Sequence, residues 1–107
     1  MKSFILLLSL LLLTHQFLVV AVPFSGPASV FWSSPTEREA GQFLDVTEIG
    51  GFEIRYKTVS SSSWSTLLLD RFANYYTFPW LEGDYNIEIA TFDNNGLYSN
   101  FISLTAH

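Results

Sequence analysis

The chain has 107 residues, of which 5 are Lys or Arg and 10 are Asp or Glu, so its formal net charge is −5. It contains no cysteine, which excludes disulfide scaffolds, thiolate metal sites and cysteine nucleophiles. With 49% hydrophobic and 17% aromatic residues it is too apolar for a disordered chain, and its few basic residues argue against a nucleic-acid-binding surface. The length allows one small domain.

The first 21 residues have the features of a secretory signal peptide. Lys2 precedes an apolar run over Phe4–Leu13, and Val19-Val20-Ala21 places small or medium residues where a signal peptidase reads the chain. We therefore expect cleavage after Ala21 and a mature domain over residues 22–107 that is secreted, periplasmic or held at the cell surface. The alternative is an uncleaved anchor, because this apolar stretch approaches the roughly 20 residues that span a bilayer.

Beyond Ala28 the apolar residues recur with a period of two, which predicts strands. In the clearest run, Phe52–Lys57, apolar residues alternate with charged ones. The other predicted strands cover residues 28–33, 64–69, 76–78 (closed by Pro79), 85–90 and 102–105, with a long irregular segment over residues 33–50. Short strands with frequent turns predict an all-β sandwich of six or seven antiparallel strands.

The same alternation divides the aromatic residues between core and surface. The expected core aromatics are Trp32, Phe52, Tyr56, Tyr76, Phe78 and Tyr85. Leu44, Val46 and Ile49 are expected to hold the irregular segment to this core. The aromatics expected outside or on loops are Phe31, Trp64, Trp80, Phe92, Tyr98 and Phe101. Their simplest role is to cover sheet faces, but exposed aromatics also anchor protein interfaces and stack on sugars.

Six segments, in order, resemble a fibronectin type III domain over about residues 28–106. They are Val30–Pro35, Gly51–Lys57, Trp64-Ser65-Thr66, Tyr76-Thr77-Phe78 with Leu81, Tyr85–Thr91 and Asn95–Ser99. Residues 35–39 and 49–51 are similar to the version found in bacterial exported proteins. The resemblance implies an immunoglobulin-like sandwich that acts as a binding module.

Two features depart from that family's pattern. The corner Leu81–Tyr85 is short and lacks a proline. Only residues 22–27 are available for the family's first strand, so that strand is expected to be short, unpaired or absent. Its absence would expose an edge of the next strand to pairing with another chain.

The sequence shows no arrangement typical of catalysis or metal binding. Cleavage would leave His107 as the one histidine, so no serine in the folded body has a histidine to activate it. The carboxylate pairs Glu37/Glu39 and Glu82/Asp84 make a small hydrolase conceivable but least favoured. Asp93-Asn94-Asn95-Gly96 offers oxygen ligands without the spacing of a calcium loop, and reads as a turn.

The sequence therefore predicts a non-catalytic, exported interaction module without cofactor or metal, which binds a protein at the cell envelope or outside the cell. The candidate binding residues are Trp64, Trp80, Asp93, Asn94, Asn95 and Tyr98. A carbohydrate-binding module that uses exposed aromatics is the main alternative. Self-assembly through an uncovered strand edge is another. The identity of the partner and the oligomeric state stay open.

Overall fold

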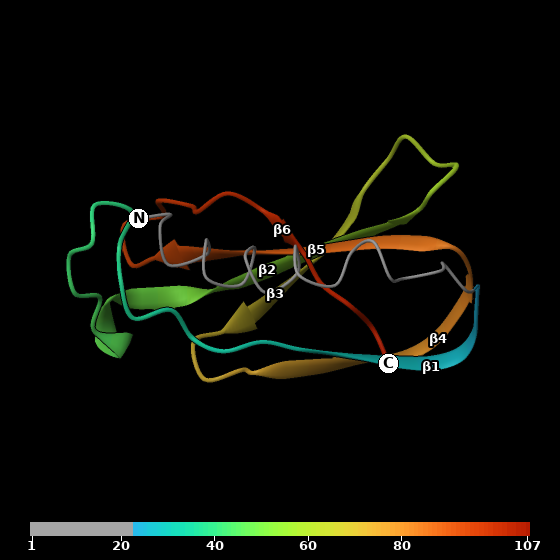
Figure 1. Ribbon diagram of the computed structural model, residues 1–107, viewed down its shortest axis with the longest axis horizontal. Helices are drawn as coiled ribbons and strands as arrows, with labels where there is room; N and C mark the ends of the chain where they lie inside the picture. Colours follow the sequence, from blue (N-terminus) through green and yellow to red (C-terminus); the bar gives the residue numbers. More distant parts are fainter. Residues whose placement is uncertain (1–22) are drawn as a thin grey trace.

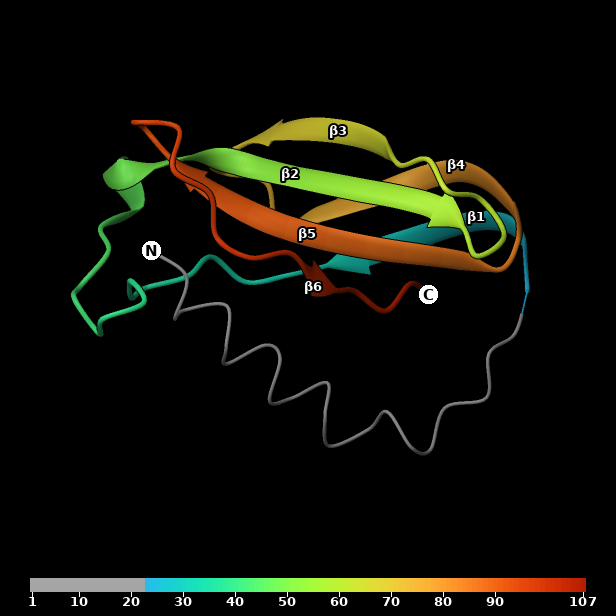
Figure 2. The same cartoon turned by 90° about the horizontal axis from the view of Figure 1, so that it is seen from above.

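The computed structural model describes residues 23–107, which form two antiparallel sheets packed face to face (Figure 1). The smaller sheet pairs β1 (Phe24–Phe31) with β4 (Tyr75–Gly83). The larger sheet has the order β3 (Ser65–Asp70), β2 (Ile49–Thr58), β5 (Tyr85–Asp93) and β6 (Ile102–Ser103), with β3 at one edge (Figure 2). A short 3-10 helix, η2 (Val46–Glu48), precedes β2. The predicted all-β sandwich of antiparallel strands is confirmed; the predicted signal peptide lies outside the described residues.

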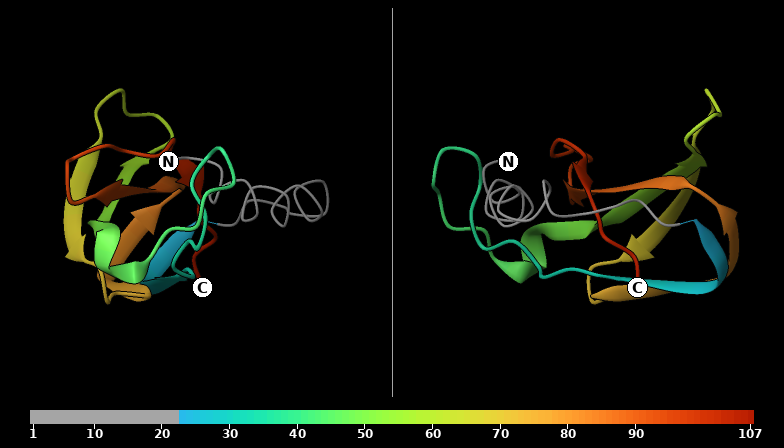
Figure 3. Two further views of the ribbon diagram at one scale, coloured as in Figure 1. Left: turned by 90° about the vertical axis from the view of Figure 1, so that its left-hand side faces the viewer. Right: turned by 45° about the vertical axis from the view of Figure 1, so that its right-hand side comes forward.

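Side chains alternate between the inside and the outside along the two central strands, β2 and β5. Ile54 and Ile89 are register partners, and both are buried between the sheets. Their neighbours Arg55 and Glu88 form an ion pair on the opposite face. The inner faces of the two layers (Figure 3) meet in one hydrophobic core. Since each fully buried large apolar side chain stabilises the fold by about 1.5–3 kcal/mol, this core is the main source of stability in a chain without disulfides.

The aromatic core lies where the sequence predicted it. Trp32, Phe52 and Phe78 are buried, and the three predicted tyrosines pack against them, half-buried. The rings of Trp32 and Phe52 lie 5.6 Å apart between centroids, and Tyr56 and Tyr76 each meet Phe78 edge-on at 4.9 and 5.0 Å. These tilted and edge-on arrangements are the ones that aromatic pairs prefer.

The irregular segment over residues 33–50 is held to the core at two of the three predicted positions. Leu44 and Ile49 are buried. The prediction for Val46 is wrong, because Val46 is the first residue of η2 and is 48% exposed. This short helix buries none of its residues and is fixed by its polar cap at Asp45 instead.

β4 is longer than the sequence predicted. The strand that was expected to close at Pro79 continues to Gly83. Pro79 and Trp80 stand opposite Pro27, at a register shift between Gly26 and Ala28 of β1. A bulge leaves its extra residue out of the ladder, so a proline without an N–H is tolerated there.

No separate first strand precedes β1 among residues 23–107, because Phe24–Gly26 already pair with β4 as part of β1. The outer edge of β1 is covered in part by the last residues of the chain, which run from β6 to β1 (Figure 1). Ser29 N–H donates to the carbonyl oxygen of His107 (2.9 Å), and His107 N–H donates to that of Ser29 (2.8 Å). The absence of a separate first strand was expected to expose this edge of β1, but the last residues of the chain cover it at Ser29.

Gly51 of β2 provides a test of this packing. A Cβ at Gly51 would collide with the carbonyl oxygen of Leu69 and stand 2.8 Å from Cζ of Phe92. We expect Gly51→Ala to lower the free energy of unfolding by about 2–3 kcal/mol, because overpacking against backbone displaces the strands.

Gly83→Ala is the matched control, measured by urea denaturation alongside. Gly83 has a positive φ of 103° but open space around its missing Cβ, so we expect a loss of about 1 kcal/mol from backbone strain alone. Equal losses at the two positions would contradict the close approach of Phe92 to Gly51.

Candidate binding surfaces

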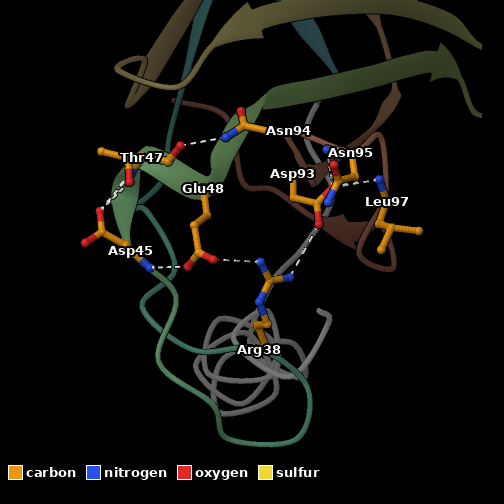
Figure 4. Close-up of polar contacts among 8 residues, drawn as sticks. All are labelled: Arg38, Asp45, Thr47, Glu48, Asp93, Asn94, Asn95 and Leu97. Atoms are coloured by element: carbon orange, nitrogen blue, oxygen red, sulfur yellow. Dashed lines mark hydrogen bonds and ion pairs between the residues drawn. The ribbon is translucent and has the colours of Figure 1, made fainter.

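The turn after β5 is a closed structural cluster (Figure 4). Oδ1 of Asp93 accepts hydrogen bonds from the backbone N–H groups of Asn95 and Leu97, both at 2.9 Å. Oδ2 of the same carboxylate lies 3.4 Å from Nη1 of Arg38. Gly96 completes the turn with a positive φ of 81°. Both oxygens of Asp93 are therefore committed to contacts within the chain.

Arg38 joins this turn to the helix η2. Its Nη2 lies 3.5 Å from Oε2 of Glu48, whose Oε1 accepts from the backbone N–H of Asp45 at 3.0 Å. The Asp45 carboxylate accepts from the N–H and the hydroxyl of Thr47, and the reciprocal contacts of Asp45 with Glu48 form a capping box. Asn94 donates from Nδ2 to the Thr47 carbonyl at 2.6 Å. The predicted site residues Asp93 and Asn94 thus connect the turn after β5 to the segment that precedes β2. Arg38 and Glu48 were not among the predicted site residues, although the Asp45-x-x-Glu48 spacing is a recognisable capping signal.

Hydrogen bonding favours the charged form of the Asp93 carboxyl. Burial raises its pKa, but the hydrogen bonds from the backbone of Leu97 and Asn95 and from Arg38 outweigh burial, and the pKa is lowered from 3.8. A lowered folded-state pKa stabilises the fold fully above the unfolded-state pKa, about 3.9 for an aspartate. That contribution is lost as the pH falls through the folded-state pKa.

Trp64 lies on the outer face of the larger sheet, where cations cover its ring. The guanidinium carbon of Arg55 is 4.4 Å from the centroid of a Trp64 ring and 4.0 Å from that of Phe101, and Nζ of Lys57 is 5.2 Å from a Trp64 ring. Nε of Arg55 also donates to Glu88 at 2.7 Å. Arg55 and Glu88 therefore form an ion pair across β2 and β5. Half-buried Trp64 is therefore already engaged within the chain.

Tyr98 covers the other end of this outer face. Its ring packs beside that of Phe92, with centroids 5.1 Å apart, and its hydroxyl donates to Oε1 of Glu53 at 2.8 Å. Burial, together with the hydrogen bond to the Glu53 carboxylate, raises the pKa of the Tyr98 phenol. Tyr98 therefore serves the packing of the sheet, with only part of its ring exposed to solvent.

Trp80 is the most exposed of the three aromatic candidates and is held in place. Its side chain is 60% exposed. Its Nε1 donates to Oε1 of Glu82 at 2.7 Å, and its Cζ3 lies 4.0 Å from where a side chain on Gly26 would begin. A ring that is exposed and already ordered loses little side-chain entropy when a ligand binds.

A second exposed aromatic pair lies on the same small sheet. Phe31 and Tyr75 are register partners in β1 and β4, each 58% exposed, and their rings stack with centroids 6.0 Å apart. Between this pair and Trp80, the hydroxyls of Ser29 and Thr77 are hydrogen-bonded at 2.8 Å. Tyr75 was not among the predicted site residues, because its pairing with Phe31 depends on the register between two distant strands. We call this set the β1–β4 surface: Ser29, Phe31, Tyr75, Thr77, Trp80 and Glu82.

The acidic residues considered for hydrolysis are all exposed. Glu82 accepts a hydrogen bond from Trp80, and neither pair is shielded from solvent in the way that general acid–base catalysis needs. Within residues 23–107, no three His, Asp or Glu side chains gather as metal ligands would.

In comparisons with known proteins, no protein-family model and no curated protein matches this chain. The part of the chain that the structure describes contains no helix long and apolar enough to cross a membrane.

Asp93→Asn tests the closed turn. Asparagine keeps the size and an accepting oxygen but loses the charge that faces Arg38, so we expect the free energy of unfolding to fall by about 1 kcal/mol at pH 7. Because the pKa of Asp93 is lowered in the folded state, this deficit should shrink as the pH falls below about 4.

Urea denaturation at pH 7 and pH 3 measures the deficit, and Asp84→Asn is the control. Asp84 is an exposed carboxylate between β4 and β5, so its substitution should leave the stability nearly unchanged at both pH values. A deficit for Asp93→Asn of the same size at pH 3 as at pH 7 would contradict the role given to its charge.

Proposed function

We propose that this protein is an exported, non-catalytic binding module of the fibronectin type III kind that recognises another protein through the β1–β4 surface. The observation that carries the proposal is Trp80, which is 60% exposed while its Nε1 donates a hydrogen bond to Glu82 and its ring lies near Gly26. The stacked pair Phe31 and Tyr75 supplies a second aromatic group on the same sheet. Ordered aromatic side chains are the usual energetic centres of protein interfaces.

The strand arrangement supports the resemblance to fibronectin type III domains. The segments that resemble the family's second and fifth strands, β1 and β4, pair in one sheet. Those that resemble its third, sixth and last strands, β2, β5 and β6, lie together in the other. This is the division of strands found in immunoglobulin-like sandwiches.

Comparison of Trp80 with the other two aromatic residues predicted as binding candidates also favours the β1–β4 surface. Trp64 is covered by Arg55 and Lys57, and Tyr98 is tied to Glu53. A ligand that bound to either ring would first have to displace these contacts. The exposed ring of Trp80 can be contacted without such a displacement. The two aromatic groups lie five residues apart along β4, about 16 Å at the usual strand rise, which suits an extended segment of a partner.

Carbohydrate binding is the second candidate function, and one observation favours it. The hydroxyls of Ser29 and Thr77 lie between the two aromatic groups. Alternating rings and hydroxyls match the apolar faces and hydroxyl groups of sugars, which stack on tryptophan and tyrosine.

Trp80→Ala should weaken binding of the native partner by about 30-fold, the loss that corresponds to the ~2 kcal/mol of a typical hot spot. Trp64→Ala should leave binding unchanged. The partner is identified by photo-crosslinking from Thr77 in the native host, and its affinity for both variants is measured by calorimetry. Urea denaturation confirms that each variant is folded. Loss of binding in Trp64→Ala but not in Trp80→Ala would contradict the proposal.

A glycan array probed with the same two variants separates the two candidate functions. Signal on the array that disappears with Trp80→Ala favours a sugar ligand. A silent array, with a protein crosslinked at Thr77, favours the protein-binding module.

Export has its own test. Protein recovered from outside the cytoplasm of cells that express the full chain should have an intact mass that lacks residues 1–21. A full-length species extracted only with membranes would support the anchor instead.

A further inference from the structure

The two sheets have four edge strands, and three of these edges are covered or interrupted. The edge of β1 carries the hydrogen bonds between Ser29 and His107 and is broken by the bulge at Pro27. β4 contains Pro79 at the same bulge. β6 is only two residues long. Prolines, bulges, short strands and covering segments are the devices by which proteins prevent unwanted pairing at sheet edges.

β3 lacks every one of these devices. Its register with β2 runs without a shift from Ser65 to Asp70. It contains no proline, lysine or arginine, and its one charged residue is its last. No described segment pairs with its outer side (Figure 2). Leu68, in the middle of the strand, is 68% exposed. The strand therefore presents a regular row of unpaired backbone N–H and C=O groups to the solvent, and only one of its side chains is charged.

We propose that β3 pairs with β3 of a second copy of this chain, antiparallel and about a two-fold axis at Leu68. The two four-stranded sheets would then form one continuous sheet. In this register Leu68 stands opposite the partner's Leu68, Leu67 opposite the partner's Leu69, and Thr66 opposite the partner's Asp70. An isologous contact of this kind closes after two copies.

The strand's own sequence selects this register. Directly opposite residues of an antiparallel pair project to the same face, so Leu67 and Leu69, which pack against the core, keep the core side in both copies. A slip by one residue would place Leu68 on that side. The register also separates the two Asp70 carboxylates and sets each across from a threonine hydroxyl. Self-complementarity of the five residues Thr66–Asp70 in this register is the reason for assigning a second copy as the occupant.

The interface is small, since it consists of one short strand from each copy. Interfaces well below the usual 800 Å² or so per partner are weak or transient. We therefore expect an equilibrium between monomer and dimer that depends on concentration. The pairing leaves the β1–β4 surface free. The dimer can therefore be tested independently of the proposed function.

Analytical ultracentrifugation of protein purified from cells that express the full chain tests the proposal. The wild-type protein should shift toward dimer as its concentration rises. Leu68→Lys should remain monomeric, because like charges would stand directly opposite each other. Leu97→Lys is the matched control: it makes the same change at a leucine that is 59% exposed in the turn after β5, and it should dimerise as the wild type does.

The register is tested by a cysteine at the proposed axis. Because the chain has no cysteine of its own, Leu68→Cys can crosslink only to another copy. Opposite Cα atoms in an antiparallel pair are about 4.5–5.5 Å apart, within the range that a disulfide spans. Leu68→Cys should therefore oxidise to a covalent dimer much faster than Leu97→Cys. A monomer at every concentration, a dimer that survives Leu68→Lys, equal crosslinking of the two cysteine variants, or a different protein paired at β3 would each overturn the proposal.

Discussion

The pairing of β2 with β5 is the interaction on which the rest of the structure depends. After a register shift between Ile49 and Gly51, the two strands keep one antiparallel register from Gly51 opposite Phe92 to Thr58 opposite Tyr85. One face of this ribbon supplies Ile54 and Ile89 to the core, and the other carries the ion pair of Arg55 with Glu88. β3 and β6 extend the ribbon on its two sides, and the pair β1–β4 closes on its apolar face. Since no disulfide is possible, this alternation of side chains must hold the layers together.

Internal contacts decide which surfaces remain for a ligand. On the larger sheet, Arg55 lies against Trp64 and Phe101, and Tyr98 is bonded to Glu53. At one end of the sandwich, the turn at Asp93 is fixed by Arg38. The smaller sheet differs, because its exposed rings are ordered by contacts that leave them open to solvent. We therefore propose a ligand on the β1–β4 surface and a second copy at β3. Both places have exposed groups that are not covered by other parts of the described chain.

The sequence predicted the features that depend on local alternation and turn chemistry. The period of two located β2 and β5, and it placed Trp32, Phe52 and Phe78 in the core. It did not predict the length of β4, because a proline within a strand is tolerated at a sheet edge or a bulge, and both of these depend on how β4 pairs with β1. The contacts of Arg38 with Asp93 and of Phe31 with Tyr75 join residues far apart in the chain. The first contact depends on the path of the irregular segment before β2, and the second on the register between two distant strands.

Residue-resolved amide hydrogen exchange is the most direct test of the central claim that β2 and β5 form the stable middle of the sandwich. Ile54 and Ile89 each have paired strands on both sides. Their amides should exchange only when the whole domain unfolds, and should show the largest protection in the protein. Amides of the loop over residues 37–43 should exchange through local openings many times faster. Exchange at Ile54 and Ile89 that is as fast as in that loop would contradict the fold described above.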